Sequence, residues 1–183
     1  MTIHLAALAV ALRDGTAHLE PIVEEHRDGL RAACAADPDI WPIYSRSFIG
    51  DAFDAEFDAL LYGPARAMFA AFAGGVPIGM TGFFDIQPAH RSLEIGYTYL
   101  APQARGTGLN DRFKRLMLGR AFGCGFDRVQ FKVDARNARS QAALRKLGAV
   151  QEGTLRHHMV TWTGHVRDSV IFSILADEWR QRG

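Results

Sequence analysis

The sequence predicts a single mixed α+β domain. The chain has 183 residues, which is the usual length of one domain. Hydrophobic residues make up 48% of it, enough to form a core and too many for intrinsic disorder. Segments with apolar residues at helical spacing lie between segments typical of strands. We find no internal repeat, low-complexity tract or linker, so we expect residues 1–183 to form one domain.

The charge and the cysteine content exclude several classes of protein. The 21 basic and 20 acidic side chains give a formal net charge of +1, unlike the strongly basic domains that bind nucleic acids. Cys34 and Cys124 lie far apart and match no metal-ligand spacing. We see no signal peptide, and no apolar run reaches the ~18 residues that a membrane span needs. We therefore expect a cytoplasmic protein with no metal, no nucleic-acid partner and no membrane partner.

In the first third of the chain, the sequence predicts a β-hairpin followed by two helices. The Asp14–Gly15 pair is typical of a hairpin turn, so we expect one strand before it and a second strand through Leu19. A helix follows this hairpin. Residues 37–50 contain two prolines and are expected to form a loop. Asp51 then caps a second helix, which ends at Gly63–Pro64.

The middle of the chain predicts three consecutive antiparallel strands. Two apolar runs, 68–73 and 76–84, are joined by Gly74–Gly75, as in a hairpin. Residues 92–100 form a third strand, in which alternation places one set of side chains on a single face. This set is Leu93, Ile95, Tyr97 and Tyr99.

The second half of the chain alternates helices and strands. The expected elements are a helix from Gly108 to Gly123, a strand at 128–133, a helix opened by Ser140 and closed by Gly148, and strands at 154–162 and 169–175. Both helices end at glycines, which are common at helix C-termini. We expect the final two strands to be joined around Gly164.

The most specific local motif is Gln103–Gly108, between a predicted strand and a predicted helix. Its glycines let backbone N–H groups approach a ligand, and the helix N-terminus adds partial positive charge, so the loop suits a phosphate. No Walker A sequence follows, and position 111 is Asp rather than the third glycine of a dinucleotide fingerprint. A plain glycine turn is the alternative. Asn137 and Ser140 are residue types favoured at a helix N-cap.

Four motifs follow one another at consistent spacing. In chain order they are Glu94-Ile-Gly-Tyr97, Gln103-x-x-Gly106-x-Gly108, Asn137-x-x-Ser140, and Leu147-Gly148-Ala149 followed by Glu152-Gly153. Together they resemble the motifs of the GNAT superfamily of N-acetyltransferases. The C-terminal part, with Glu152-Gly-Thr-Leu-Arg156, Gly164, Asp168 and Glu178-Trp179, is similar to the RimJ/RimL branch. The resemblance covers roughly Gly79 to Trp179.

This resemblance implies a mostly antiparallel twisted sheet with a splayed central strand pair and flanking helices. The strand with Glu94 to Leu100 would diverge from the strand with Phe131, and the pantetheine arm of acetyl-CoA would enter the gap. Residues from about 67 to 183 would form the acetyl-CoA-binding core, and residues from about 1 to 66 the variable acceptor side. The implied contacts of the cosubstrate are Tyr99, Leu100, Gln103, Arg105, Gly106, Thr107, Gly108, Leu109, Asn137, Ser140 and Lys146.

The resemblance also implies transfer of an acetyl group from acetyl-CoA to a primary amine. The acceptor would be a protein N-terminal α-amine or a small-molecule amine, attacking directly through a tetrahedral intermediate. Glu94 is the expected base, acting directly or through a water; the alternative interpretation is that Glu94 is a carboxylate exposed at the surface. Ser140, or else Tyr97, would protonate the thiolate; the alternative interpretation of Tyr97 is that it packs in the core. A backbone N–H near Tyr99 or Leu100 would stabilise the oxyanion.

We expect Trp41, Tyr44 and His157 in the acceptor pocket, although both aromatics also suit a core. His157 and His158 are adjacent on a strand, so only one of them faces the pocket. RimL-type enzymes carry a glutamate near the position of Met159, which this chain lacks.

The acceptor and the assembly are less defined than the donor. Deprotonating an α-amine at pH 7 costs about 1–1.4 kcal/mol and a lysine-like amine about 4.6 kcal/mol, so an α-amine is the easier acceptor. A non-catalytic acyl-CoA-binding module is the alternative function. An exposed edge strand would allow a homodimer.

The near-neutral charge divides unevenly along the chain. Residues 1–102 contain 6 basic and 13 acidic side chains, whereas residues 103–156 contain 12 and 4. The basic part coincides with the expected acetyl-CoA half, and the acidic part includes the expected acceptor side. The division predicts an anionic cosubstrate on one side and a cationic acceptor on the other.

Overall fold

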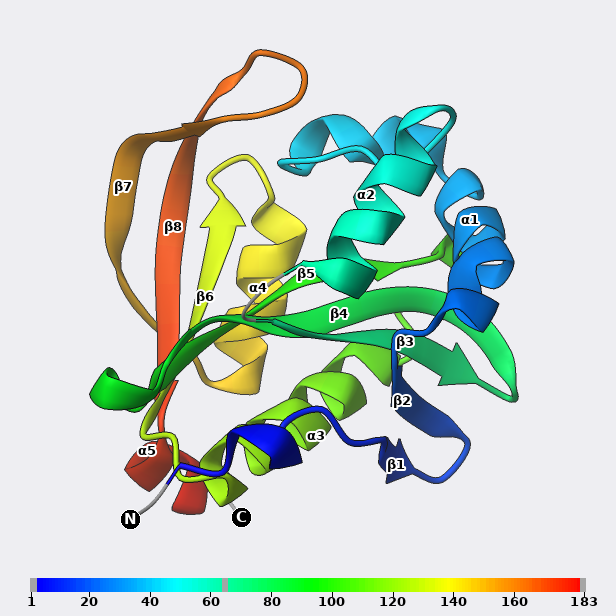
Figure 1. Cartoon of the computed structure of the whole chain (residues 1–183). Coiled ribbons are helices and arrows are strands. Elements are labelled where there is room, and N and C mark those ends of the chain that lie inside the picture. Colours follow the sequence, from blue (N-terminus) through cyan, green and yellow to red (C-terminus); the bar gives the residue numbers. More distant parts are fainter. Residues whose placement is uncertain (1–2, 64–65, 182–183) are drawn as a thin grey trace.

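The computed structural model describes residues 3–63 and 66–181. Its centre is an eight-stranded sheet in the order β1-β2-β3-β4-β5-β6-β8-β7 (Figure 1). The strands are β1 Leu12–Asp14, β2 Ala17–Pro21, β3 Ala67–Ala73, β4 Val76–Gln87, β5 Ser92–Leu100, β6 Arg128–Asp134, β7 Val150–Val160 and β8 Val166–Leu175. Neighbours are antiparallel except β5 and β6, which run parallel. This mixed, mostly antiparallel sheet confirms the predicted fold class.

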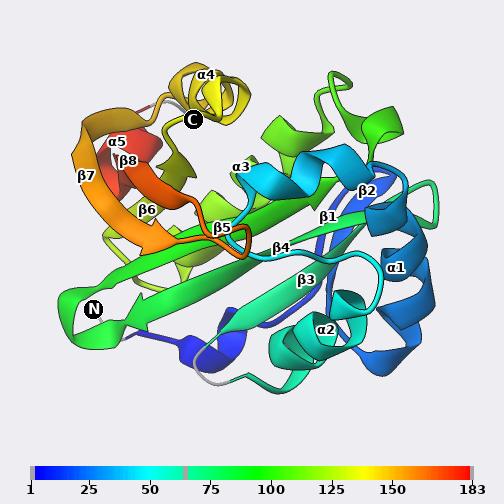
Figure 2. The same cartoon turned by 90° about the horizontal axis from the view of Figure 1, so that it is seen from above.

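Helices cover both faces of the sheet. They are α1 Arg27–Ala35, α2 Ala52–Tyr62, α3 Leu109–Gly123, α4 Ala138–Leu147 and α5 Ala176–Arg180. The helices α1 and α2 lie on one face and α3 on the opposite face (Figures 1 and 2). Within the described residues, no helix combines the length and the apolar character needed to cross a membrane.

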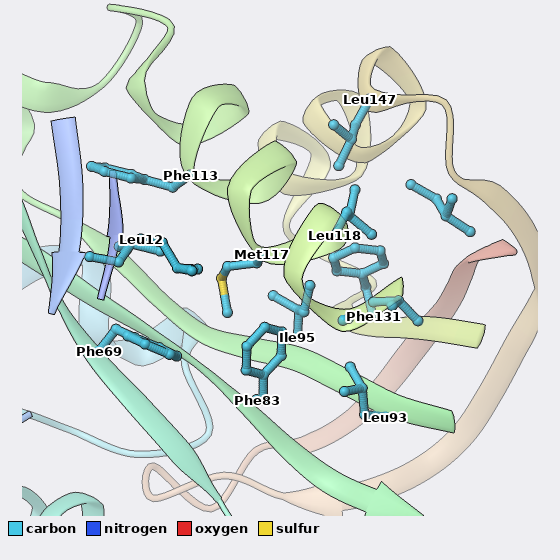
Figure 3. Close-up of a cluster of buried hydrophobic side chains, with 14 of the residues drawn as sticks. Leu12, Phe69, Phe83, Leu93, Ile95, Phe113, Met117, Leu118, Phe131 and Leu147 are labelled. Carbon is cyan, nitrogen blue, oxygen red and sulfur yellow. The ribbon is translucent and has the colours of Figure 1, made fainter. Parts of the chain in front are cut away.

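The larger hydrophobic core lies between the sheet and α3. Phe83, Leu93 and Ile95 point from their strands toward Met117 and Leu118 of α3 (Figure 3). Burying each such side chain contributes roughly 1.5–3 kcal/mol. This packing fixes α3, and with it the loop that precedes the helix, against β4 and β5.

A β-bulge at Tyr97 changes which face of β5 its side chains occupy. Tyr97 has a φ of 50°, and β5 has one more residue than β4 between two successive cross-strand pairs. Leu93 and Ile95 belong to the core beneath α3, whereas Tyr99 belongs to a second core beneath α1 and α2, against which Tyr97 packs. The prediction that these four residues share one face is therefore wrong, because the extra residue interrupts the alternation.

The parallel pair β5 and β6 separates soon after it begins. The two strands pair only at Ser92↔Arg128, Leu93↔Val129 and Glu94↔Gln130. Beyond Glu94, β5 continues along β4 and β6 continues along β8. The expected splayed strand pair is therefore present, and the divergence begins at Glu94.

Two segments near the N-terminus differ from expectation. Leu5–Ala7 forms a 3₁₀ turn, so that the first strand is confined to Leu12–Asp14. Pro38–Ile43, expected as part of a loop, forms a 3₁₀ helix around the buried Trp41. Burial of this large aromatic ring gives the segment a fixed conformation despite its prolines.

The ends of α2 and α4 also refine the predictions. Asp51 occupies the N-cap position of α2 but makes no side-chain cap hydrogen bond. Gly63 ends α2 as predicted, whereas Pro64 lies outside the described residues. In α4 the cap is Asn137, whose Oδ1 accepts the N–H of Ser140 at 3.0 Å, so the helix begins before Ser140 rather than at it.

Candidate active site

A cleft of about 610 Å³ lies where β5 and β6 diverge. The loop before α3 and the first turns of α4 contribute to its walls. The expected site residues on its walls are Tyr44, Glu94, Tyr97, Leu100, Arg105, Gly106, Gly108, Asn137, Ser140 and Lys146. The structure thus brings together residues of the first three motifs, and the fourth contributes Leu147 to the wall. Among the described residues, no group of three or more His, Cys, Asp or Glu side chains is placed to hold a metal ion.

The edge of β5 presents main-chain groups to the cleft. The N–H of Ala101 bonds to Ile78 O at 2.8 Å, so Ala101 and Tyr99 direct their main-chain groups toward β4. Thr98 and Leu100 alternate with them and direct theirs toward the gap. Tyr44 Oη and Arg105 Nε donate to the carbonyl oxygens of Thr98 and Leu100, at 3.0 and 2.7 Å. The N–H groups of Thr98 and Leu100 lie on the same edge and suit a ligand carbonyl.

The loop before α3 has the geometry of an anion site. Gly106 and Gly108 have φ values of 75° and 86°, and a Cβ atom at either position would meet open space. The loop leads into the 15-residue helix α3, whose first N–H groups have no intrahelical partner. A group that approaches these glycines would meet backbone donors and the positive end of the helix dipole.

Glu94 is buried at the point where β5 and β6 separate. Only 3% of the residue is exposed, so it is not the surface carboxylate that the sequence left open. Burial raises the pKa of Glu94 to about 7, although Lys132 opposes the shift through its positive charge. Lys132 Nζ lies 2.8 Å from Glu94 Oε2. A carboxyl group with this pKa exchanges protons readily at neutral pH.

Charged side chains from three further strands surround this carboxylate. Asp85 in β4 has a φ of 47° and lies 3.4 Å from Lys132 Nζ. Arg167 in β8 donates from Nη2 to the carbonyl oxygen of Lys132 at 3.1 Å. His158 in β7 lies on the cleft wall and contacts Ser169 Oγ through Nδ1 at 3.0 Å. Burial, together with the charges of Lys132 and Arg167, lowers the pKa of His158.

Lys114 is a buried cleft residue that the sequence reasoning missed. It projects from α3, is 6% exposed, and donates from Nζ to Thr98 Oγ1 at 2.5 Å. Burial lowers its pKa to about 7. A signal was present in the sequence, because Lys114 falls at helical spacing with the core residues Met117, Leu118 and Ala121.

Several expected site residues have other positions. Trp41 and Tyr99 stack in the second core, with ring centroids 4.7 Å apart, and do not line the cleft. Arg105, expected near phosphates, does line the cleft, but its guanidinium pairs with Asp37. His157 is exposed with a φ of 49°, so its neighbour His158 is the histidine on the cleft wall. The remaining expected contacts outside the wall are Gln103, Thr107 and Leu109.

The hydroxyl groups of the site come from two sides. Ser140 lies in the first turn of α4, half-buried on the cleft wall. Tyr97 packs edge-on against Phe84 with centroids 5.2 Å apart, yet it also lines the cleft. Tyr44 is fixed by its bond to β5, and burial raises its pKa to about 12, so at neutral pH it acts only as a hydrogen-bonding group.

The splayed parallel pair, the glycine loop at a helix N-terminus and the carboxylate between them define an acyltransferase of the acetyl-CoA-dependent class. Comparison with known families agrees with this geometry. The family described as "Acetyltransferase (GNAT) domain" matches residues 17–150 of the chain. The chain therefore belongs to the GNAT acetyltransferase family.

Solved structures place the chain within this family. A probable GNAT acetyltransferase from Chromobacterium violaceum is 30% identical, with a TM-score of 0.88 over 94% of this chain and 89% of that chain. A putative acetyltransferase from T. thermophilus is 35% identical, with a TM-score of 0.86 over 93% and 92%. RimL, described as a ribosomal L7/L12 α-N-protein acetyltransferase in complex with coenzyme A, is 19% identical, with a TM-score of 0.74 over 90% and 97%. This last similarity shows the fold alone. No curated protein matches the sequence.

Proposed function

We propose that the protein transfers the acetyl group of acetyl-CoA to the α-amine of a protein N-terminus or of a small molecule. The observation that carries this proposal is the buried carboxylate of Glu94, which lines the cleft where the β5 edge becomes free. A carboxylate with a pKa of about 7 can accept the proton that the attacking amine loses at neutral pH.

The residues of the cleft fit acetyl-CoA. Gly106 and Gly108 leave open space in front of backbone donors, as a pyrophosphate requires. Lys146 and Arg139 lie on the same wall and supply positive charge. The unpaired edges of β5 and β6 suit the amide groups of a pantetheine arm, because buried backbone donors and acceptors need partners. When bound, acetyl-CoA supplies an activated acetyl thioester.

Glu94 would accept the proton that the acceptor nitrogen, bound as a neutral amine, must lose as the amide bond forms. Its side chain is 4% exposed behind Lys132, so the proton would travel through a water molecule rather than by direct contact. The neutral amine attacks the thioester carbonyl carbon, so that the C–N bond forms in a tetrahedral intermediate, and the C–S bond breaks when this intermediate collapses. The N–H groups of Thr98 and Leu100 would bind the developing oxyanion, and this edge geometry favours Leu100 over Tyr99.

Ser140 would give its hydroxyl proton to the departing thiolate and regain a proton from water. Its position in the first turn of α4 places it near the positive end of that helix, which favours a thiolate nearby. Tyr97 lines the same cleft from the bulge and is the second hydroxyl within the site.

Two points support an α-amine as the acceptor. Deprotonating an α-amine at pH 7 costs about 1–1.4 kcal/mol, within the reach of one base, whereas a lysine-like amine costs about 4.6 kcal/mol. Structural neighbours from Vibrio fischeri and Salmonella typhimurium are described as a ribosomal-protein-S5-alanine acetyltransferase and as an enzyme that modifies the N-terminal serine of L7/L12. Peptides with free N-termini are therefore the first acceptors to test.

The test follows thiol release from acetyl-CoA with a panel of peptides and small amines. We expect saturable release with at least one α-amine, and a roughly 10²–10⁴-fold loss at pH 7 in Glu94→Gln. Glu25→Gln, at an exposed position, is the matched control and should retain activity. Acetyl-CoA binding without thiol release for any amine would refute the proposal and identify a non-catalytic acyl-CoA-binding module.

A further inference from the structure

Arg167 is a buried cation on the cleft wall with few partners. The residue is 7% exposed and lines the cleft near Glu94. Its guanidinium donates from Nη2 to Lys132 O at 3.1 Å, and its Nε is enclosed without an acceptor among the described residues. A guanidinium has five N–H donors and remains charged in proteins. Most of its donors therefore have no protein acceptor among the described residues.

The carboxylates near Arg167 are bound to other cations. Asp134 accepts hydrogen bonds from Arg136, at 3.0 Å from Nε and 2.8 Å from Nη2. Glu94 faces Lys132 at 2.8 Å. Among the described residues, no carboxylate lies within 4 Å of the Arg167 guanidinium. A buried and unpaired charge is unfavourable, so the position suits an oxygen atom that arrives with a ligand.

Arg167 and Glu94 act on one region of the cleft. Lys132 links them, because its Nζ contacts Glu94 and its carbonyl oxygen contacts Arg167. The charge of each also shifts the pKa of the other. Both side chains line the same cleft, so one ligand can present its nitrogen to Glu94 and a nearby oxygen to Arg167.

We propose that Arg167 binds the carbonyl or carboxylate oxygen on the carbon next to the amine-bearing carbon of the acceptor. The inference rests on the proposed function and narrows its substrate class to α-amino acyl groups. An N-terminal residue presents an amide carbonyl at this position and a free amino acid presents a carboxylate, and a guanidinium can donate to either. A lysine side-chain amine has no oxygen there. Arg167 is thus a specificity-determining residue that selects α-amines over side-chain amines.

The first experiment compares acceptors in wild type, Arg167→Met and Arg167→Lys. The acceptors are a short peptide with a free N-terminus, glycine, and ethylamine, which has no carbonyl. We expect Arg167→Met to raise KM roughly 10- to 100-fold for the acceptors with the oxygen, with the KM for acetyl-CoA and kcat/KM for ethylamine unchanged. Arg167→Lys should recover part of the loss. A larger effect on glycine than on the peptide would identify a carboxylate ligand, and the reverse an amide carbonyl.

Equal losses for all three acceptors, or no loss, would overturn the proposal and leave Arg167 a structural role. Arg180→Met, at an exposed arginine paired with Asp177 in α5, is the matched control.

A second experiment measures binding and does not need turnover. In the presence of coenzyme A, N-acetylglycinamide should bind roughly tenfold or more tightly than N-ethylacetamide, and Arg167→Met should remove the difference. Equal binding of the two amides to wild type would refute the role of Arg167, whereas absent turnover with this difference intact would refute only the proposed function.

Discussion

The buried Lys114 makes the stability of the protein depend on pH in a way that can be calculated. Its pKa is lowered by burial from an ordinary value of 10.5 to about 7. Between these values the unfolded chain binds a proton that the folded protein does not, so stability rises with pH over this range. The whole difference corresponds to about 5 kcal/mol. From pH 7 to pH 9 the contribution of Lys114 to the free energy of unfolding is about 2 kcal/mol.

The assay is urea unfolding at pH 7, 8 and 9 for wild type and for Lys114→Met. Methionine has a similar length, and the Thr81 and Thr98 hydroxyl groups can still bond each other at 2.8 Å. We expect wild type to gain about 2 kcal/mol more than the variant between pH 7 and pH 9, because other titrating groups cancel in the difference. Lys146→Met, at an exposed lysine, controls for the substitution itself. Parallel pH dependences of wild type and Lys114→Met would refute the reasoning.

Three further variants test the site. Lys132→Met removes the ammonium 2.8 Å from Glu94, so the pKa of Glu94 should rise and the acidic limb of the kcat/KM profile should move to higher pH. Lys132→Arg keeps the positive charge and should leave this limb nearly in place. An unmoved limb in Lys132→Met would count against Glu94 as the base. Gly108→Val puts a β-branched side chain at a φ of 86° and into the open space proposed for the pyrophosphate. Calorimetry should therefore show weaker acetyl-CoA binding. Gly119→Ala, where a Cβ meets open space within α3, is the control and should bind acetyl-CoA normally. Asn137→Ala removes the cap bond to Ser140 and should lower the free energy of unfolding in urea by about 1 kcal/mol; an unchanged midpoint would mean that the cap is dispensable.

The sequence predicted elements where a local pattern determines them. The glycine pair between β3 and β4 and the Asp14–Gly15 turn both form the hairpins expected of them. The splayed strand pair followed from the resemblance carried by four motifs, not from periodicity, whereas the strand order and the start of the divergence at Glu94 came from the structure. Neither the local sequence patterns nor the family resemblance predicted the β-bulge at Tyr97. One inserted residue leaves the apolar composition of a strand unchanged, so hydrophobic alternation cannot reveal it.

The chemistry of the site was the harder part to predict, because it depends on burial. A glutamate on an alternating strand can face either solvent or a cleft. Only the packing of β4, β6 and β8 around Glu94 decides which of the two its side chain faces. Lys132 and Arg167 had no local signal, since each is an ordinary charged residue in a strand. The role of Lys132 arises from the parallel register of β5 and β6, which brings it to Glu94 at the beginning of the splay. Arg167 reaches the same region from β8, where its Nη2 donates to Lys132 O.

The charge division along the chain has a different meaning in three dimensions. The acidic side chains of α2 are bound to arginines: Asp54 and Asp58 contact Arg27 at 2.9 and 2.5 Å, and Glu56 contacts Arg46 at 3.1 Å. The negative field that these acidic side chains were expected to exert on a cationic acceptor is therefore largely neutralised by their arginine partners. The charged residues of the cleft wall are instead mostly basic. The cations are Arg46, Arg105, Lys114, Lys132, Arg139, Lys146 and Arg167, and the anions are Glu94, Asp111 and Asp134. Arg46 and Arg105 are paired with Glu56 and Asp37 outside this wall, so the excess positive charge comes from the other cations.

A basic cleft should bind its acceptor as the neutral amine. Like charges disfavour the protonated form, so the cations around Glu94 should lower the pKa of an amine that enters. The KM for the acceptor should then fall about tenfold per pH unit below the solution pKa of the amine and level off above it. Two acceptors with different pKa values, measured at saturating acetyl-CoA, separate this effect from the titration of Glu94, because only the amine's own break point moves with the acceptor. A KM that stays constant or rises with pH would show that the ammonium form binds, and that the acidic side chains of the chain, not its cleft cations, control acceptor entry.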